Sequence, residues 1–218
     1  MAKSRPAAGG GRWVEVPPER LTRWLDGFEE RHGGLSADAG PRVVLLRGED
    51  GALAECHVPF PPLESDLAGL PGLAAHAARD RRVGVLLVRL GGYACGVFEG
   101  DRLVASKVGA RLVHGRSAAG GQSQQRFARR REGQVREALN AAADTAARVL
   151  APRAGELAAF VCGGDRRAVD ALRDDWRLGA LFALETGPFL TVPDPRLAVL
   201  RETPARFRAV RVRLVEPG

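Results

Sequence analysis

The residues best suited to chemistry lie in one stretch, "HGRSAAGGQSQQRFARRR", from His114 to Arg131. Gly120 and Gly121 permit backbone conformations that are closed to other residues, and they allow close approach to another backbone. Gln122 follows at once, with an amide donor, an amide acceptor and a backbone N–H, but no titratable group. Such a side chain is a poor general base, yet it suits positioning a water or donating to a developing oxyanion. Gln124 and Gln125 offer the same amide chemistry nearby.

Positive charge is concentrated around this stretch. Lys3 and Lys107 are the only lysines, so the excess of arginine in an alanine-rich chain partly reflects the bias of a GC-rich genome. That bias alone would not localise the charge. Between 111 and 136 there is one acid, Glu132, against seven arginines, which is +6 of the chain's net +7. These arginines are residues 111, 116, 126, 129, 130, 131 and 136. The clustering favours a nucleic-acid partner, although spacing alone also fits a surface loop followed by a solvated basic helix.

The elements around the stretch predict a covered sheet. Residues 83–90, "VGVLLVRL", are apolar on both faces, and two turns link them to "YACGVF" and "RLVASKV" in an antiparallel meander. A long helix should follow the stretch, because one apolar stripe recurs at helical spacing. The stripe consists of Ala128, Val135, Leu139, Ala142, Ala146 and Val149. Residues 156–164 should form a buried strand, and Asp165 should cap the next helix.

The rest of the chain predicts a second, smaller unit. We expect a disordered tail at 1–11, a small α+β unit at 12–78 and the larger domain at 79–218. The small unit should hold a strand, a helix that ends at Gly33-Gly34, a hairpin turning near Asp50-Gly51 and a weak helix. "VRVRLV" near the end reads as a half-exposed edge strand. The fold class is α/β (α+β mixed), with a mixed sheet covered by helices.

The sequence lacks the motifs of several common enzyme classes. The chain has no Gly-x-Ser-x-Gly elbow, no phosphate loop and no His-Glu-x-x-His. Cys56 and His57 should point to opposite faces of a strand, so they form no ligand pair, and we expect no metal site. Three widely spaced cysteines indicate buried free thiols in a reducing compartment. No apolar run approaches the roughly 18 residues of a membrane span, and "MAKSRPAAGGGRW" is not a secretory signal, so we expect a cytoplasmic protein.

The stretch resembles the catalytic loop of eukaryotic and archaeal class-I peptide release factors. That family carries His-Gly-Arg, Gly-Gly-Gln-Ser and, after two variable residues, Arg-Phe-x-Arg-x-Arg. Here these motifs are His114-Gly115-Arg116, Gly120-Gly121-Gln122-Ser123 and the segment from Arg126 to Arg131. The likeness in layout covers roughly residues 80–218, the family's catalytic domain. It implies a release-factor-like sheet of the ribonuclease-H-like, translational-machinery-component type.

The sequence departs from the release-factor pattern in two ways, which indicate a particular branch of the superfamily. Three residues, 117–119, separate His-Gly-Arg from Gly-Gly-Gln, where the release factors have none, and nothing here resembles their stop-codon-reading domain. The chain is most similar to the actinobacterial Vms-like release-factor (VLRF) proteins, regarded as peptidyl-tRNA hydrolases. In these relatives the spacing between glycines and glutamine varies, so Gln124 or Gln125 could carry the working amide in place of Gln122.

The resemblance implies hydrolysis of the peptidyl-tRNA ester on stalled ribosomes or large subunits, in ribosome rescue and quality control. It makes Gly120, Gly121 and Gln122 the catalytic residues, with Gln124 and Gln125 as alternatives. The RNA-binding residues would be His114, Arg116, Arg126, Arg129, Arg130 and Arg131. The partners would be peptidyl-tRNA and the ribosome at its peptidyl-transferase centre, with no DNA, membrane, metal or organic cofactor.

Two other functional classes remain open. A non-catalytic ribosome- or RNA-binding module would need the arginines but not the glutamine amide. A nuclease would need divalent metal, and no cluster of acids stands out in the sequence. The role of residues 12–78, the oligomeric state and the form of the ribosomal substrate do not follow from the sequence.

Overall fold

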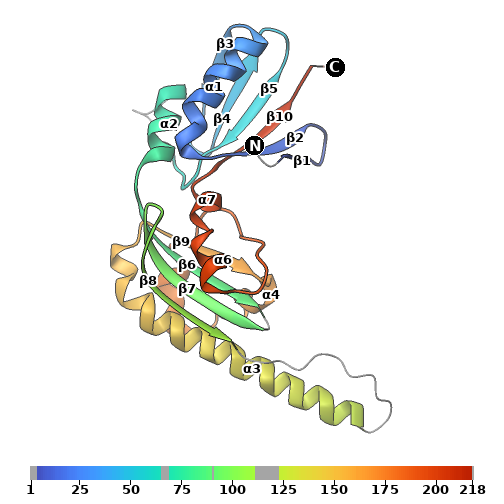
Figure 1. Cartoon of the computed structure of the whole chain (residues 1–218), viewed down its shortest axis with the longest axis vertical. Helices are drawn as coiled ribbons and strands as arrows, with labels where there is room; N and C mark the ends of the chain where they lie inside the picture. The colour runs from blue at the N-terminus through green and yellow to red at the C-terminus, as the bar shows by residue number, and fades with distance from the viewer. Residues whose placement is uncertain (1–3, 65–68, 90, 111–122, 218) are drawn as a thin grey trace. The chain divides into compact units, whose positions relative to one another are not determined.

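A computed structural model of the chain describes residues 4–64, 69–89, 91–110 and 123–217, and for residues 123–131 it describes only the helical backbone (Figure 1). The chain divides into two compact units. The first unit joins the chain up to Asp80 with the segment from Pro204 onward, and the second runs from Arg81 to Thr203. Each unit has its own sheet, so the fold is mixed α/β with two sheets, as the sequence predicts.

The first unit is built on a six-stranded sheet in the order β1-β2-β10-β5-β4-β3. All of its pairings are antiparallel. The predicted hairpin is confirmed as β4 and β5, which pair around residues 49–52. Its elements are β1 (Ser4–Pro6), β2 (Arg12–Val16), α1 (Pro18–His32), β3 (Leu35–Ala39), β4 (Val43–Gly48), β5 (Leu53–His57), α2 (Leu70–Ala78), α7 (Pro204–Phe207) and β10 (Val210–Val215).

Helix α1 covers one face of this sheet through an apolar stripe. Leu21, Leu25 and Phe28 are buried, and Trp24 is half-buried beside them. The helix ends where Gly33 takes a φ of 75°, a conformation that favours glycine. Helix α2 adds Leu73 and Ala77 to the same core. The apolar spacing of α1 is therefore what attaches it to the sheet.

The second unit is built on a four-stranded sheet in the order β8-β7-β6-β9. Strands β6, β7 and β8 form the predicted antiparallel meander, and β9 pairs parallel to β6. The strands are β6 (Arg82–Arg89), β7 (Gly92–Glu99), β8 (Arg102–Ala110) and β9 (Ala159–Gly164). The helices are α3 (Ser123–Val149), η2 (Ala151–Glu156), α4 (Arg166–Asp170), η3 (Trp176–Leu178), α5 (Gly179–Phe182) and α6 (Leu197–Arg201).

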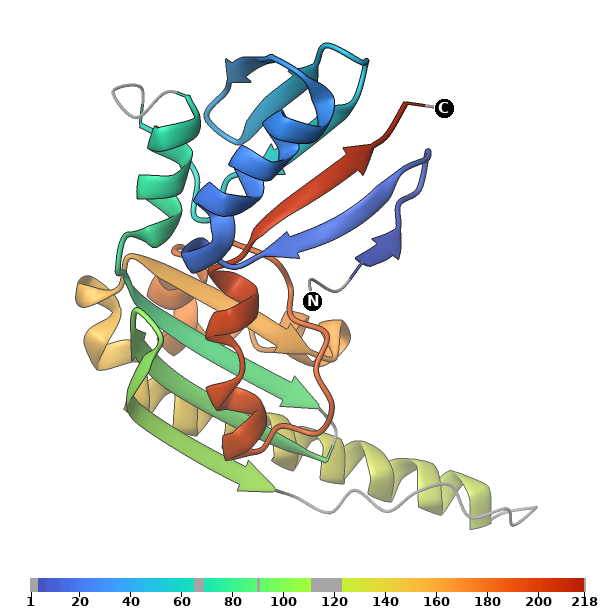
Figure 2. The ribbon, with the colours of Figure 1, turned by 45° about the horizontal axis from the view of Figure 1, so that its top comes forward.

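Helices cover both faces of this sheet, which explains its apolar strands. Figure 2 shows α3 on one face and α6 on the other. Strand β6 is buried from Val83 to Val88 because its two sets of side chains meet helices or loops on opposite sides. Asp165 caps α4 as predicted, since its carboxylate accepts a hydrogen bond from the backbone N–H of Arg167 at 3.0 Å. No described helix is long and apolar enough to cross a bilayer.

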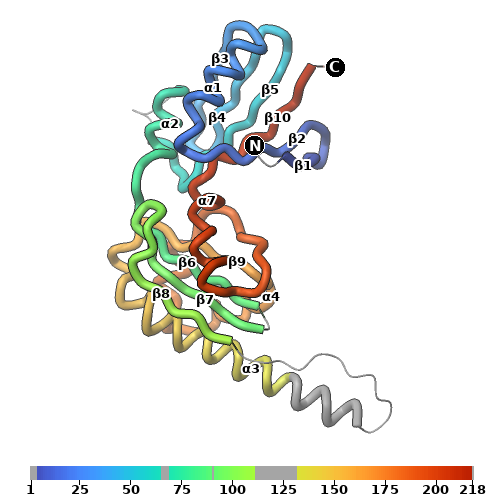
Figure 3. The backbone as a smooth tube through the Cα atoms, in the orientation of Figure 1, coloured from blue at the N-terminus to red at the C-terminus, as the bar shows by residue number. Residues whose placement is uncertain are grey.

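The structure differs from the sequence-based expectation at both ends of the chain. Within the segment expected to be disordered, Ser4–Pro6 form β1 and pair with β2. The final strand is not an edge strand, because β10 lies between β2 and β5 and pairs with both. Figure 3 traces the chain from α6 through α7 into β10. The segment from Pro204 onward therefore belongs to the first unit, whereas the sequence-based boundary assigned all of 79–218 to the second domain.

Candidate functional site

The structure frames the candidate loop from both sides without describing its centre. His114, Arg116, Gly120, Gly121 and Gln122 lie outside the described residues. The remaining predicted site residues lie in the first turns of α3, where the helical backbone is described and the side chains are not. They are Gln124, Gln125, Arg126, Arg129, Arg130 and Arg131. The contacts among the predicted site residues therefore lie outside the part of the chain whose side chains are described.

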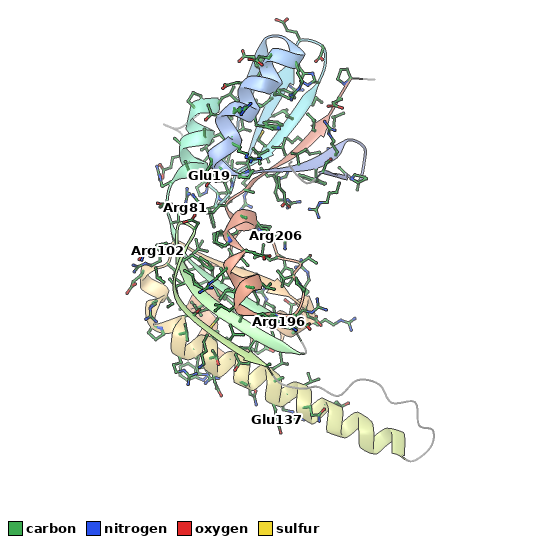
Figure 4. The ribbon with its side chains drawn as sticks, viewed as in Figure 1. Glu19, Arg81, Arg102, Glu137, Arg196 and Arg206 are labelled. Carbon is green, nitrogen blue, oxygen red and sulfur yellow. The ribbon has the colours of Figure 1, made fainter. Side chains whose placement is uncertain are left out.

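The C-terminal half of helix α3 is anchored in the core. Among the α3 side chains that the structure describes, from Glu132 onward, Ala138 is the first buried one, and Ala142 and Ala146 are fully buried against the sheet. Residues 132–137 include no buried side chain, and Glu137 lies exposed (Figure 4). At 1.5 Å per residue, the part of α3 from Ser123 to Ala138 is about 20 Å long. The helix therefore carries the C-terminal end of the candidate loop well beyond the packed core.

The apolar stripe on α3 matches the predicted one from Leu139 onward, whereas Val135, also predicted, is not part of the core cluster. Ala142 and Ala146 are buried, while Leu139 and Val149 pack half-buried against the same core. Ala128 falls among the residues whose side chains are not described. The small side chains explain the close packing, because alanine lets the helix approach the buried strands β6 and β7.

The other end of the loop leaves from β8, an edge strand of the second sheet. Tyr93 on β7 packs its ring directly over Gly109 near the end of β8, so closely that a Cβ at 109 would lie 2.3 Å from the ring. The hydroxyl of the same tyrosine accepts a hydrogen bond from Thr145 Oγ1 on α3 at 3.1 Å. Tyr93 thus ties together the strand that enters the loop and the helix that leaves it.

Tyr93 and Thr145 are positioning residues that the sequence analysis missed. Tyr93 is the only tyrosine in the chain and the second residue of β7, directly after Gly91-Gly92. A lone tyrosine beside this glycine pair is the sequence feature that could have pointed to it. Thr145 is the only threonine in α3 and is 3% exposed. Nothing in the spacing of the two residues indicates that they meet, since 52 positions separate them.

The residues and backbone groups at the start of α3 make this end of the helix electropositive. No acidic residue occupies its first turn. The unpaired backbone N–H groups of a helix start and the helix dipole both attract anions. The arginines of the following turns add full positive charges. This end of the helix can therefore hold phosphates or stabilise a negative charge that develops nearby.

The described residues offer no competing catalytic centre in the second unit. Burial raises the pKa of the Cys95 thiol to about 11, and burial is also the main cause that raises the pKa of Cys162. Both thiols stay protonated at neutral pH and make poor nucleophiles. Across the described ranges no group of three or more His, Cys, Asp or Glu side chains could hold a metal ion.

A family of known proteins matches the chain over the whole of the second unit. The model of one family, described as Actinobacteria/chloroflexi VLRF1 release factor (acVLRF1), matches residues 81–213. No curated protein matches the chain. The matched range runs from the start of the second unit through the candidate loop and most of β10.

Three solved structures are similar at low identity. An archaeal translation termination factor, aRF1, is 16% identical with a TM-score of 0.44, and the match covers 87% of this chain and 62% of that one. A structure named only as an archaeal protein is 16% identical, with a TM-score of 0.42 and coverage of 72% and 48%. S. cerevisiae Dom34, a translation termination-like factor involved in RNA quality control pathways and interacting with Hbs1, is 9% identical, with a TM-score of 0.30 and coverage of 93% and 66%.

The chain spans less than two thirds of the length of these solved relatives. Because their TM-scores are all below 0.5, the assignment rests on the family model, which matches more than half of the chain. That match confirms the resemblance indicated by the Gly-Gly-Gln stretch. The chain belongs to the Actinobacteria/chloroflexi VLRF1 release factor family.

Proposed function

We propose that this protein is a peptidyl-tRNA hydrolase that frees nascent chains from tRNA on stalled ribosomes or large subunits. One observation carries the proposal. The family match over 81–213 contains the ordered motifs His-Gly-Arg, Gly-Gly-Gln-Ser and Arg-Phe-Ala-Arg between 114 and 129. The bond to be cleaved is the ester between the peptide and the terminal ribose of tRNA, and water is the nucleophile.

In this proposal Gln122 acts without changing its protonation state. Its amide oxygen accepts a hydrogen bond from the attacking water, and its amide or backbone N–H donates to the oxyanion that forms at the ester carbonyl. Gly120 and Gly121 let the backbone approach the substrate closely. Preorganised donors of this kind stabilise a transition state without a titrating base, so no metal or organic cofactor is needed.

The position of α3 supports Gln122 over its two neighbours. The helix begins at Ser123, so Gln124 and Gln125 are inside its first turn, and Gln122 immediately precedes it. Only Gln122 directly follows the two glycines. Gln124 and Gln125 remain the alternatives to be tested, because they follow Gln122 within three positions in the sequence.

The arginines of α3 would hold RNA. The helical period puts positions 126, 129 and 130 on one side of the helix, where a phosphate backbone could meet all three. Arg131 lies off that line, and His114 with Arg116 lies before the glycines. The backbone of α3 extends about 20 Å from Ala138 to Ser123, which would give the loop the reach that a recessed ribosomal centre requires.

The experiment that tests the proposal measures peptide release directly. Purified protein is incubated with stalled ribosome–nascent-chain complexes, with isolated large subunits that carry peptidyl-tRNA and with free peptidyl-tRNA, and the fraction of peptide freed from tRNA is followed. The proposal expects release from at least one of the three substrates. Binding to ribosomes without release from any of them would favour the non-catalytic RNA-binding module and would sink the hydrolase.

A further inference from the structure

The six-stranded sheet of the first unit has one covered face and one open face. The covered face supplies side chains such as Val14, Val44 and Val212 to the core beneath α1 and α2. Residues in the alternate register positions point the other way, and none of them is buried. We call this set the open face: Arg5, Trp13, Glu15, Ser36, Asp38, Val43, Leu45, Arg47, Leu53, Glu55, His57, Arg211, Arg213 and Val215.

The centre of the open face is a group of flat side chains. The rings of Trp13 and His57 lie 5.1 Å apart between centroids, tilted by 58°. The guanidinium carbon of Arg211 lies over the Trp13 ring, 4.7 Å from its centroid. The strand register produces this group, because Arg211 pairs with His57 across β10 and β5, while β2 brings Trp13 to the other side of β10. Three planar groups therefore share one partly exposed surface.

The charge on the open face is only partly balanced. Arg213 is paired within the sheet through its terminal nitrogens, since it forms an ion pair with Glu55 at 3.2 Å and donates to the carbonyl of Gly9 at 3.0 Å, while its Nε is buried without a hydrogen-bond partner. Among the described residues, Arg5 and Arg211 form no ion pair, although Glu15 lies opposite Arg211 in the register. Arg5 and Arg211 thus form no direct ion pair, although the charge of Glu15 acts on Arg211.

The planar group on the open face also contains buried polar atoms that have no hydrogen-bond partner. Nε of Arg211 and Nε2 of His57 are buried and have no hydrogen-bond partner. Burial, followed by repulsion from Arg5, lowers the pKa of the Arg211 guanidinium, while the charge of Glu15 opposes this. A buried polar atom without a partner is costly, and so is the repulsion between neighbouring positive charges, here opposed by the single carboxylate of Glu15. A ligand that brings negative charge to this face would offset the repulsion between Arg5 and Arg211.

We infer that the open face binds unpaired RNA, with bases stacked on the Trp13, His57 and Arg211 group and phosphates held by Arg5 and Arg211. Aromatic rings and guanidinium planes on an antiparallel sheet suit the flat faces of bases, and base stacking tolerates any sequence. An acidic peptide would satisfy the charge but would leave the planar group unused. The inference is independent of the proposed hydrolysis, because it concerns the first unit and not the candidate loop.

The test uses the full chain and short fluorescent oligoadenylate and oligouridylate, with polyglutamate as an anion that has no bases. The variant R5Q/R211Q removes the two unpaired charges. Its matched control is R20Q/R23Q, which removes two exposed arginines from α1, the helix that covers the opposite face. We expect R5Q/R211Q to bind RNA at least tenfold more weakly than the control. Its log–log salt dependence should be flatter by roughly 1.4, about 0.7 for each lost phosphate contact of a single strand.

Two further measurements separate stacking from charge. Nuclear magnetic resonance of the wild type should show RNA-induced shifts of the Trp13 indole N–H and the His57 ring, while the signal of Trp24, on α1, stays in place. Arg211→Lys keeps the charge but not the plane, so RNA should bind more weakly with an unchanged salt slope. If R5Q/R211Q does not retain the wild-type circular dichroism, Arg5→Gln alone serves, because Arg5 is exposed.

Two results would overturn the inference. One is equal RNA affinity of the R5Q/R211Q and R20Q/R23Q variants, together with unshifted Trp13 and His57 signals. The other is polyglutamate that binds as tightly as RNA and moves the same signals, which would make an acidic protein segment the partner. Failure of peptide release in the hydrolysis assay would affect neither result, so the two proposals can fail separately.

Discussion

The Thr145 hydroxyl on α3 donates a hydrogen bond of 3.1 Å to the Tyr93 hydroxyl on β7. The same tyrosine ring covers Gly109 near the end of β8. One side chain therefore connects the strand before the candidate loop with the helix after it. The loop itself extends from these two elements, so their relative position sets where its two ends are held.

Tyr93→Phe should destabilise the protein by about 1–2 kcal/mol, because it leaves the buried Thr145 hydroxyl without its partner. Thr145→Val removes the other half of the pair and should cost less once Tyr93 is already Phe. Chemical denaturation of both single variants and the double variant measures this coupling. Strictly additive effects would mean that the hydrogen bond contributes nothing to stability.

Gly109→Ala should destabilise the second unit by about 1–3 kcal/mol, because the added Cβ would lie within the Tyr93 ring and the packing must shift. Gly133→Ala is the matched control. A Cβ at 133 meets no atom within 4 Å, and alanine is a better helix former than glycine by about 0.5–1 kcal/mol. Thermal unfolding should therefore move in opposite directions for the two variants. A shift of the same sign in both would refute the close packing at Gly109.

His57 should titrate below its ordinary value of 6.5. Burial lowers the pKa of His57, and the charge of Arg211 lowers it further, while Glu55 opposes this. Because the folded pKa lies below the unfolded one, the unfolded chain takes up the proton first as the pH falls. The stability contribution is complete above the unfolded pKa and is lost as the pH falls through the folded pKa.

Nuclear magnetic resonance of the imidazole signals measures this titration. Arg211→Gln removes the neighbouring positive charge and should raise the pKa of His57 toward the ordinary value. Arg20→Gln on α1 should leave it unchanged. A His57 that titrates at or above 6.5 in the wild type would contradict its burial beside Arg211.

Replacing Arg129, Arg130 and Arg131 with Ala should weaken binding to ribosomes or tRNA and flatten its salt dependence. Each lost phosphate contact should lower the log–log slope by about 0.7–0.9. The matched control removes Arg20, Arg23 and Arg31, three exposed arginines on α1. Equal slopes in the two triple variants would mean that the arginines of α3 only solvate the helix.

Periodicity predicted the elements that lie within one stretch of chain. The α3 stripe from Leu139 onward, the meander β6–β8 and the Asp165 cap follow from local spacing, and the structure has all three. The alternation of Val210, Val212 and Leu214 with Arg211 and Arg213 correctly indicated one covered face and one uncovered face. It could not distinguish an edge strand from a central strand, because a central strand of an open-faced sheet alternates in the same way.

The spacing of residues along the chain could not predict which distant strands pair. Strand β10 returns to β2 and β5 across more than 150 residues, and no local pattern encodes such a partner. Strand β1 is short and is followed by glycines, so its composition resembled a tail. At the candidate site, the motif predicted the family, whereas the bracing by Tyr93 and Thr145 required coordinates.

The central claim is that the amide of Gln122 takes part in peptide release. The most direct measurement compares the release rate from stalled ribosome–nascent-chain complexes for Gln122→Ala, Gln124→Ala and Gln125→Ala, with Gln134→Ala farther along α3 as the control. Ribosome affinity is measured alongside. Gln122→Ala should bind like the wild type but release peptide about 10²–10³-fold more slowly, the scale for losing one oxyanion donor. A large loss in Gln124→Ala or Gln125→Ala instead would move the catalytic amide within the stretch, and wild-type release rates in all three would contradict hydrolysis by this loop.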